Sequence, residues 1–221
     1  MLRLLIAEPQ SLLREAVRIA LEPSQDLRVE GEAADGRSAV ARAIDVQPDV
    51  AVVDADLRTD DRPTVQAIVE AVPGCGVLAL LSETNEERVV VALSLGAAGV
   101  VSRGAPLRDL ESAVRAVALG EAVVPPLVLR RVIRRLIEDG RGRDEARRTL
   151  GRLTPREREV LALLVRGGDN LTIGRALRIS PDTARTHVHN LLRKLSLHSR
   201  LEAAAFVLQR GLADDLEAEL A

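Results

Sequence analysis

Residues 4–10 read LLIAEPQ, an apolar run that leads into the acid Glu8 and then into Pro9. An apolar run of this length is typical of a buried strand. Because ligands of open α/β sheets bind at the carboxyl ends of the strands, an acid at this point is typical of domains that handle phosphate. Pro9 has no side-chain oxygen or nitrogen, so the stretch raises the question whether a reaction takes place at this strand end.

Four more apolar runs follow in the first half of the chain, separated by stretches with apolar residues at helical spacing. The five strands are expected at residues 3–7, 28–32, 50–54, 77–81 and 99–101. One expected helix carries its apolar face on Leu12, Leu13, Ala16, Val17 and Ala20. The alternation predicts a doubly wound, five-stranded parallel sheet of the flavodoxin-like α/β type over residues 1–121. Glu8, Asp54 and Ser82 each stand at the carboxyl end of a strand and are expected to meet in one pocket.

The charge is distributed unevenly along the chain of 221 residues. Residues 1–121 carry 12 basic and 20 acidic side chains, a net charge of −8, whereas residues 122–210 carry 19 basic and 9 acidic ones, a net charge of +10. A basic half of this kind is typical of a protein that binds a polyanion. The chain has no Trp or Tyr to stack on unpaired bases, which favours double-stranded DNA over single-stranded nucleic acid.

Several classes of protein are disfavoured by what the sequence lacks. Cys75 is the only cysteine, which excludes an internal disulfide and a cysteine metal cluster. No apolar run reaches the roughly 18 residues of a membrane span, and the N-terminus lacks the pattern of a secretion signal. There is no P-loop and no Ser/His/Asp or Cys/His set in a sensible context. We therefore expect a cytoplasmic protein that has no metal site, contacts no membrane and is not an enzyme.

The second half of the chain begins at a break in the pattern. Pro125 and Pro126 interrupt it, and residues 122–150 are expected to form a largely helical, basic linker. Residues 151–221 have purely helical spacing, which predicts an all-α domain of four helices.

The helix boundaries of this domain carry recognisable capping signals. Thr154 and Glu157 form a capping box with a proline at the first helical position, which marks a helix start. Asn170 is expected to cap the second helix and Ser180 the third, whereas the fourth covers residues 200–210.

The third helix is the most informative one. In SPDTARTHVHNLLRKL (180–195), a stripe suited to burial is formed by Ala184, Val188, Leu191 and Leu195. The opposite face carries Asp182, Arg185, Thr186, His189 and Arg193. Two short helices joined by a tight turn, the second with a polar outer face, form the plan of a helix-turn-helix that enters the major groove.

Roles on DNA follow from the chemistry of these side chains. Arg185 has the planar fork that bonds guanine O6 and N7, and Thr186 and His189 lie on the same face within reach of base edges. Phosphate contacts are expected from Thr183, Arg193, Lys194 and Arg200.

The helical half resembles, without gaps, the LuxR-type helix-turn-helix of NarL/FixJ-type response regulators over residues 153–200, LTPREREVLALLVRGGDNLTIGRALRISPDTARTHVHNLLRKLSLHSR. The first half resembles the receiver domain of the same family in LLIAEPQSLLREAV (4–17), PDVAVVDADL (48–57) and LGAAGVVSRGAP (95–106). The resemblance spans nearly the whole chain. Its arginine-rich, lysine-poor composition is similar to that of actinobacterial members.

The resemblance implies a switch in which a partner histidine kinase phosphorylates a receiver aspartate and so changes DNA binding. Asp54 matches the phosphoacceptor, Ser82 the hydroxyl residue that contacts the phosphoryl group, and Glu8 the first of two acids that hold Mg²⁺.

This chain also departs from the family. Pro9 replaces the second Mg²⁺-binding acid, and Arg103 replaces the lysine of the fifth strand in the receiver pocket. The loop ADLRTDDRP (55–63) lacks the family's Met-Pro-Gly turn, and Val100 replaces the usual aromatic residue. Since Mg²⁺ demands oxygen ligands in near-octahedral geometry, we expect no cofactor, and Mg²⁺ only if the receiver is active. The acids of the loop are an alternative source of cation ligands.

The last expected helix carries an apolar stripe on Leu201, Ala205, Leu208 and Leu212. The stripe packs within its own domain, and the resemblance implies dimerisation through it. Expected partners are double-stranded DNA, a second copy of the chain or a related regulator, and RNA polymerase. A histidine kinase is a partner only if Asp54 is phosphorylated.

Three functions remain open at this point. The leading hypothesis is a sequence-specific transcriptional regulator whose receiver responds to protein or small-molecule contacts and not to phosphorylation. The alternative is a conventional two-component regulator phosphorylated on Asp54. A protein-sequestering adaptor that binds no DNA is disfavoured by the basic outer face of residues 182–193.

Overall fold

The computed structural model of the chain describes residues 1–125, 150–197, 199–209, 212–213 and 216. It separates into two compact units, Met1–Pro125 and Pro126–Ala221. The expected linker lies for the most part outside the described residues. The first unit extends past the expected boundary at residue 121, because the backbone of Val123 is hydrogen-bonded to Ala98 and Val100 beside the sheet.

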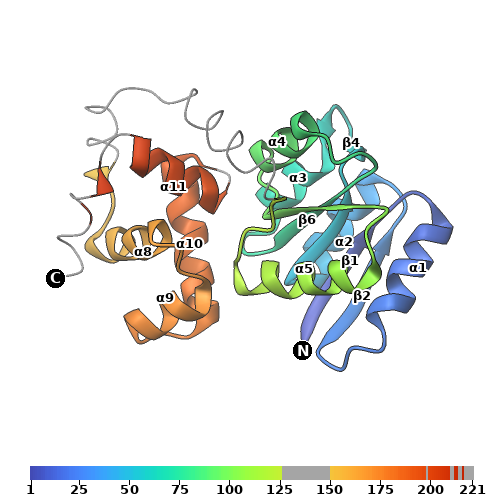
Figure 1. The fold of residues 1–221 in the computed structure, drawn as a ribbon, viewed down its shortest axis with the longest axis horizontal. Coiled ribbons are helices and arrows are strands. Elements are labelled where there is room, and N and C mark those ends of the chain that lie inside the picture. Colours follow the sequence, from blue (N-terminus) through green and yellow to red (C-terminus); the bar gives the residue numbers. More distant parts are fainter. Residues whose placement is uncertain (126–149, 198, 210–211, 214–215, 217–221) are drawn as a thin grey trace. The chain divides into compact units, whose positions relative to one another are not determined.

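The first unit is built on a five-stranded parallel sheet with the strand order β2-β1-β3-β6-β7 (Figure 1). Its strands are β1 (Leu2–Ala7), β2 (Leu27–Ala33), β3 (Val50–Asp54), β6 (Gly76–Leu81) and β7 (Gly99–Ser102). The five predicted strands are therefore confirmed to within one residue at each end. The chain reverses direction across the sheet between β1 and β3, and ligands of doubly wound sheets bind at such a switch point.

Helices cover the sheet: α1 (Ser11–Leu21), α2 (Gly36–Val46), α3 (Thr64–Ala71), α4 (Glu86–Ser94) and α5 (Leu107–Leu119). One apolar cluster joins α1 and α5 to every second residue of the central strands, among them Leu4, Ile6, Val50 and Val52. The intervening strand residues Leu5, Ala51 and Val53 are also fully buried. Because both faces are covered, the central strands are continuous apolar runs and do not alternate with polar residues.

One expected core residue of this unit faces solvent. Leu12 is 81% exposed, whereas Val17 and Leu21 carry the buried face of α1. A helix turns by about 100° per residue, so Leu12 lies well away from the line through Val17 and Leu21. The prediction that Leu12 belongs to the apolar face was wrong.

A small hairpin in the loop after β3 was not predicted. Its strands, β4 (Arg58–Thr59) and β5 (Arg62–Pro63), are too short to show any periodicity. Gly36, at the start of α2, packs directly against this loop. A Cβ atom at Gly36 would lie 2.1 Å from the backbone oxygen of Arg58 and 2.3 Å from Oγ1 of Thr64. The hairpin is therefore held in place by a contact that only glycine permits.

The described part of the second unit contains the four predicted helices: α8 (Pro155–Val165), α9 (Asn170–Leu177), α10 (Pro181–Leu195) and α11 (Arg200–Gln209). The capping box of Thr154 and Glu157 is confirmed, and the Ser180 side chain caps α10 as expected. The cap of α9 is Asp169, which accepts a hydrogen bond from the backbone of Thr172 at 2.6 Å. The prediction of Asn170 was wrong by one residue, because its side chain is buried inside the domain.

The core of this unit forms on one side of α10. The predicted stripe of Ala184, Val188, Leu191 and Leu195 is buried and packs against apolar residues of α8, α9 and α11. On the opposite face of α10, Asp182, Thr183, Thr186 and Arg193 are exposed. None of the described helices is long and apolar enough to cross a membrane.

Candidate functional site

Two acids meet at the switch point of the sheet. Glu8 follows β1, and Asp54 is the last residue of β3. Their exposed fractions are 0% and 3%, although both are ionisable side chains. Buried acids of this kind require partners, because the loss of water around a carboxylate is costly unless other groups replace it.

The partner of both acids is Arg103, which lies just after β7. Its Nη2 atom donates to Glu8 Oε2 at 3.0 Å and also to Asp54 Oδ2, so that one nitrogen bridges the two carboxylates. The backbone nitrogen of Arg103 donates to the Leu81 oxygen at 2.9 Å, which ties the residue to the end of β6. The guanidinium of Arg103 thus contacts both acids.

Backbone groups bind the remaining carboxylate oxygens. Gln10 N donates to Glu8 Oε1 at 2.9 Å, and Asp56 N donates to Asp54 Oδ1 at 2.9 Å. Because Pro9 adds no side-chain oxygen and Arg103 already contacts both acids, this donor set does not fit a Mg²⁺ ion. The structure therefore describes an internally paired acid–guanidinium cluster, formed by Glu8, Asp54 and Arg103.

The other expected pocket residues lie outside this cluster. Ser82 follows β6 directly, but its side chain is exposed and takes no part in the cluster. The loop acids are engaged elsewhere, since Asp56 pairs with Arg88 and Asp60 pairs with Arg37 at 2.9 Å. These pairings do not favour the alternative in which the loop acids provide a cation site.

The outer face of α10 is the second candidate site. Asp182, Thr183, Thr186, Arg193 and Lys194 are exposed there, whereas Arg185 and His189 are half-buried. This arrangement matches the polar face that the sequence predicts. A helix with such a face and with its opposite face in a domain core has the form of a recognition helix.

Several of these side chains already have partners within the domain. Thr186 Oγ1 donates to the Asp182 backbone oxygen at 3.0 Å, and Thr183 Oγ1 lies 2.8 Å from Ser180 Oγ. Lys194 Nζ donates to Glu157 Oε2 at 2.7 Å, which connects α10 to the capping box of α8. A role of Lys194 at a DNA phosphate therefore competes with this ion pair.

His189 is half-buried. Its Nε2 atom is buried and has no hydrogen-bond partner among the described residues. Burial lowers the pKa of His189 below its ordinary value of 6.5, and the neighbouring positive charge of Arg193 lowers it further. His189 is thus favoured in its neutral form.

Arg200 forms contacts that the sequence did not suggest. Its guanidinium donates to the Gly168 oxygen at 3.3 Å and to Asn170 Oδ1 at 3.1 Å. It therefore braces α11 against the turn before α9, and its expected phosphate contact stays a prediction. Arg156 donates to the Leu177 oxygen at 2.7 Å and caps the end of α9, a contact that was not predicted from the sequence. No local pattern reveals such contacts, since their partners lie far away in the sequence.

The expected dimerisation stripe is divided between core and surface. Leu212 is buried in the core of its own domain, Ala205 is also buried, Leu201 is half-buried, and Leu208 is 59% exposed. Only part of the stripe is thus accessible to a second copy. A helix that packs on its own domain can present only its outward positions, and the periodicity does not distinguish these from the inward ones.

The comparisons with known proteins agree with this architecture. Residues 151–207 match the family described as "Bacterial regulatory proteins, luxR family". The chain is 30% identical over 212 residues to the uncharacterized transcriptional regulatory protein YxjL of Bacillus subtilis (strain 168), which covers 96% of this chain and 97% of YxjL. It is 32% identical over 215 residues to the response regulator protein VraR of Staphylococcus aureus (strain NCTC 8325 / PS 47), with 96% and 98% covered.

A solved structure shares the fold. The RcsB response regulator of Salmonella typhimurium superposes with a TM-score of 0.53 at 20% identity, over 94% of this chain and 98% of that one. The chain therefore belongs to the LuxR-type response regulators. It is a DNA-binding regulator with a receiver-type α/β domain and a C-terminal helix-turn-helix domain.

Proposed function

We propose that this regulator controls transcription without phosphorylation of Asp54, and that protein or small-molecule contacts with its receiver set its activity. The observation that carries the proposal is the bridge from Arg103 to both Glu8 and Asp54. The cation that phosphoryl transfer needs beside the acceptor is replaced by a side chain of the protein itself.

The chemistry of the Arg103 bridge supports the proposal that Asp54 is not phosphorylated. Metal ions in phosphoryl transfer neutralise developing charge and bridge oxygens of the transferred group. A guanidinium supplies charge but no open coordination position, and arginine is not equivalent to lysine at a tight site. Asp54 Oδ2 would have to leave Arg103 before it attacks a phosphodonor, which would leave buried charges uncompensated.

The test is the intact mass of the full chain after incubation with Mg²⁺ and acetyl phosphate, with Asp54→Asn as the matched control. We expect no added phosphoryl group under conditions that label a conventional response regulator. An adduct that forms on the unaltered chain and is lost in Asp54→Asn would overturn the proposal.

The second candidate is a conventional two-component regulator with a histidine kinase as partner. It is favoured by Asp54, which still ends β3, and by the relative VraR, which is named a response regulator. In that case Arg103→Lys should label faster than the unaltered chain, because lysine is the family's residue at this position. If neither the unaltered chain nor Arg103→Lys takes up a phosphoryl group, the result argues for control without phosphorylation of Asp54.

The oligomeric state on DNA is also a proposal. We infer that the chain binds as a homodimer, or as a heterodimer with a related regulator, to two half-sites about one helical turn apart. The exposed Leu208 on α11 supports a contact between copies, and RcsB has been solved as two dimers bound to two parallel DNAs. A stoichiometry of one chain per duplex in analytical ultracentrifugation would contradict this proposal.

We further propose that the protein acts in the cytoplasm, with DNA and RNA polymerase as partners and without enzymatic activity. Gel-shift titrations at several salt concentrations test the DNA part directly. Binding through phosphates should weaken steeply as salt rises, and selectivity among duplexes should remain. If the protein binds all duplexes equally at every salt concentration, its DNA binding is non-specific and this part of the proposal is wrong.

A further inference from the structure

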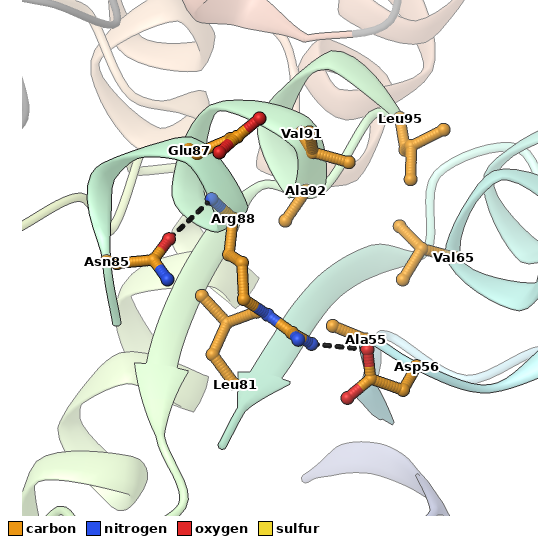
Figure 2. A pocket seen from close by; sticks show the side chains of 10 residues that line it. All are labelled: Ala55, Asp56, Val65, Leu81, Asn85, Glu87, Arg88, Val91, Ala92 and Leu95. Carbon is orange, nitrogen blue, oxygen red and sulfur yellow. Dashed lines mark hydrogen bonds and ion pairs between the residues drawn. The ribbon is translucent and has the colours of Figure 1, made fainter. Parts of the chain in front are cut away.

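A cavity of ≈ 310 Å³ opens between α3 and α4, next to the carboxyl ends of β3 and β6. Its wall is mostly apolar and comes from Val65, Leu81, Ala92 and Leu95, together with Ala55 of the loop after β3 (Figure 2). The volume is at the lower end of the range for small-molecule sites, which are mostly apolar with a few placed polar groups. The cavity therefore has room for one compact molecule.

An ion pair lines the polar side of the cavity. Arg88 extends from α4 and contacts the Asp56 carboxylate, as Figure 2 shows. The third charged residue of the lining, Glu87, holds its carboxylate on the outer side of α4, away from Asp56 (Figure 2). An anion would have to displace Asp56 from Arg88, and a cation would have to displace Arg88 from Asp56. Neither charge on a ligand is therefore favoured, and a charge that is buried without a partner is costly.

The space itself comes from small side chains. Ala55 and Ala92 line the cavity at positions where a larger side chain would fill part of it. Ala92 is 2% exposed and Val91 is 51% exposed, so the cavity extends from the buried face of α4 to a side that is open to solvent. A rigid ring that enters from the open side loses less conformational freedom on binding than a flexible chain of the same size.

We propose that this cavity binds a compact, uncharged and largely apolar ring compound. The ring contacts Val65, Ala92 and Leu95, and the affinity comes from the removal of this apolar surface from water. The ion pair of Arg88 and Asp56 stays intact beside the bound ring. The ligand is thus selected by its shape and by its lack of charge.

The cavity is connected to the acid–guanidinium cluster through the loop after β3. Ala55 and Asp56 line the cavity, and the backbone nitrogen of Asp56 donates to Asp54 Oδ1 at 2.9 Å. A ring that packs against Ala55 therefore stabilises the loop that binds Asp54. This regulatory consequence rests on the proposed function, because it names the class of small molecule that acts on the receiver. Binding of the ring compound does not rest on it.

The composition of the chain allows a direct measurement. Because the protein has no Trp or Tyr, the fluorescence of an indole probe can be followed without protein background. The probes are indole, indole-5-carboxylate and 5-(aminomethyl)indole, which share one ring system and carry no charge, a negative charge and a positive charge. We expect the anisotropy of indole to rise saturably with the full-length chain. Both charged probes should bind roughly fivefold more weakly, because each charge loses water without gaining a partner.

Two variants locate the site by its shape. Ala92→Leu fills part of the cavity and should weaken all three probes about tenfold, with circular dichroism to confirm that this buried substitution leaves the fold intact. Leu95→Ser removes part of the apolar wall at a half-buried position and should weaken indole about fivefold. Leu107→Ser, at an exposed leucine outside the lining, is the matched control and should leave indole binding unchanged.

Two further variants test the role of the ion pair. Asp56→Asn removes the carboxylate that neutralises Arg88, and indole-5-carboxylate should then bind roughly threefold to fivefold more tightly, the upper range for a solvent-exposed ion pair. Arg88→Met removes the guanidinium that neutralises Asp56, and 5-(aminomethyl)indole should gain by a similar factor. If each variant changes the three probes alike, the ion pair does not set the charge preference and the assignment of an uncharged ligand is wrong.

The outcomes separate this site from the proposed function. Saturable indole binding that weakens in Ala92→Leu and in Leu95→Ser supports the site, whatever happens at Asp54. Tighter binding of either charged probe than of indole to the unaltered chain would overturn the assignment, as would binding that ignores these variants or no binding of any probe. A phosphoryl adduct on Asp54 together with specific indole binding would contradict only the proposed function.

Discussion

The acid–guanidinium cluster of the receiver and the outer face of α10 use charge in opposite ways. In the cluster, Glu8 and Asp54 are buried and share the guanidinium of Arg103. On α10, charged residues such as Arg193 stay exposed on the face that the domain core does not cover. A charge that is satisfied inside the protein organises structure, whereas one left at the surface remains available to a partner.

This difference predicts two kinds of effect when a charged residue is changed. Arg103 changes the receiver because its partners, Glu8 and Asp54, are buried and almost inaccessible to water. Changes on the outer face of α10 should alter DNA binding and leave the domain folded, since the apolar core packs against the opposite face of this helix.

The largest effect is expected for Arg103→Met. The substitution leaves Glu8 and Asp54 buried without their shared cation, and breaking a buried pair typically costs about 3–5 kcal/mol. Hydrogen exchange followed by mass spectrometry should show β1 and β3 opening at correspondingly lower free energy. Adding Glu8→Gln and Asp54→Asn should recover part of the loss. Unchanged protection in Arg103→Met would mean that the cluster contributes nothing to the fold.

Substitutions at two glycines test whether each domain can be destabilised without affecting the other. Gly36→Ala forces a Cβ into the backbone of Arg58, and Gly174→Ala forces one to 2.9 Å from the Ile179 oxygen in the turn before α10. Each should cost roughly 1–3 kcal/mol, the range for overpacking. In hydrogen exchange, the first should loosen only the receiver and the second only the helical domain. Gly104→Ala is the control, because the nearest atom to its Cβ lies 3.8 Å away.

On the DNA side, Arg185→Ala should cost about 1–3 kcal/mol of binding and relax selectivity at one base pair. The reason is the loss of a bidentate contact with guanine, which a methyl group cannot replace. Competition gel shifts with single-base variants of a selected duplex measure both quantities. If all duplexes weaken by the same factor, Arg185 contacts phosphate and does not read a base.

A smaller effect is expected for Lys194→Ala. The substitution removes the ion pair with Glu157, and exposed pairs contribute about 0.2–1 kcal/mol. Burial opposes ionisation of Glu157, but the hydrogen bonds from Lys194 and from Thr154 outweigh it and lower its pKa. The pKa should therefore rise in Lys194→Ala, as carboxyl NMR would show. Glu157→Gln removes the same ion pair but keeps Lys194. If DNA binding weakens in Lys194→Ala and not in Glu157→Gln, Lys194 contacts a DNA phosphate.

The smallest effect concerns the pH dependence of the helical domain. Because the folded pKa of His189 is below its ordinary value of 6.5, its contribution to stability is present above pH 6.5 and is lost as pH falls through the folded pKa. Histidine NMR titration should place its midpoint below that of a denatured sample. Arg193→Ala should raise the midpoint slightly. A midpoint above the ordinary value would contradict the burial of Nε2.

The fold was predictable where a pattern repeats. Buried strands and amphipathic helices recur over enough residues to identify all five main strands of the receiver and the four described helices of the second unit. The β4–β5 hairpin was missed because strands of two residues have no period. The cap of α9 was misplaced because Asp169 and Asn170 are both good caps, and the buried position of Asn170 is decided by Arg200 from another helix.

The sites were predictable only in part, for the same physical reason. The residues of the acid–guanidinium cluster could be named from strand ends, but nothing local shows that Arg103 bridges both acids. The cavity lined by Asp56 could not be predicted from the sequence, since its walls come from α3, α4 and two strand ends.

The sequence by itself determined the order of the elements, the faces that they bury and the charge difference between the two halves. These depend on short-range periodicity and composition, which act along the chain. Only the tertiary structure decided the partners of the charged side chains: Arg103 with two acids, Lys194 with Glu157, and Arg200 with the turn before α9. Such pairings depend on distances between segments far apart in sequence, and a hydrogen bond is lost when its atoms are misplaced by an ångström.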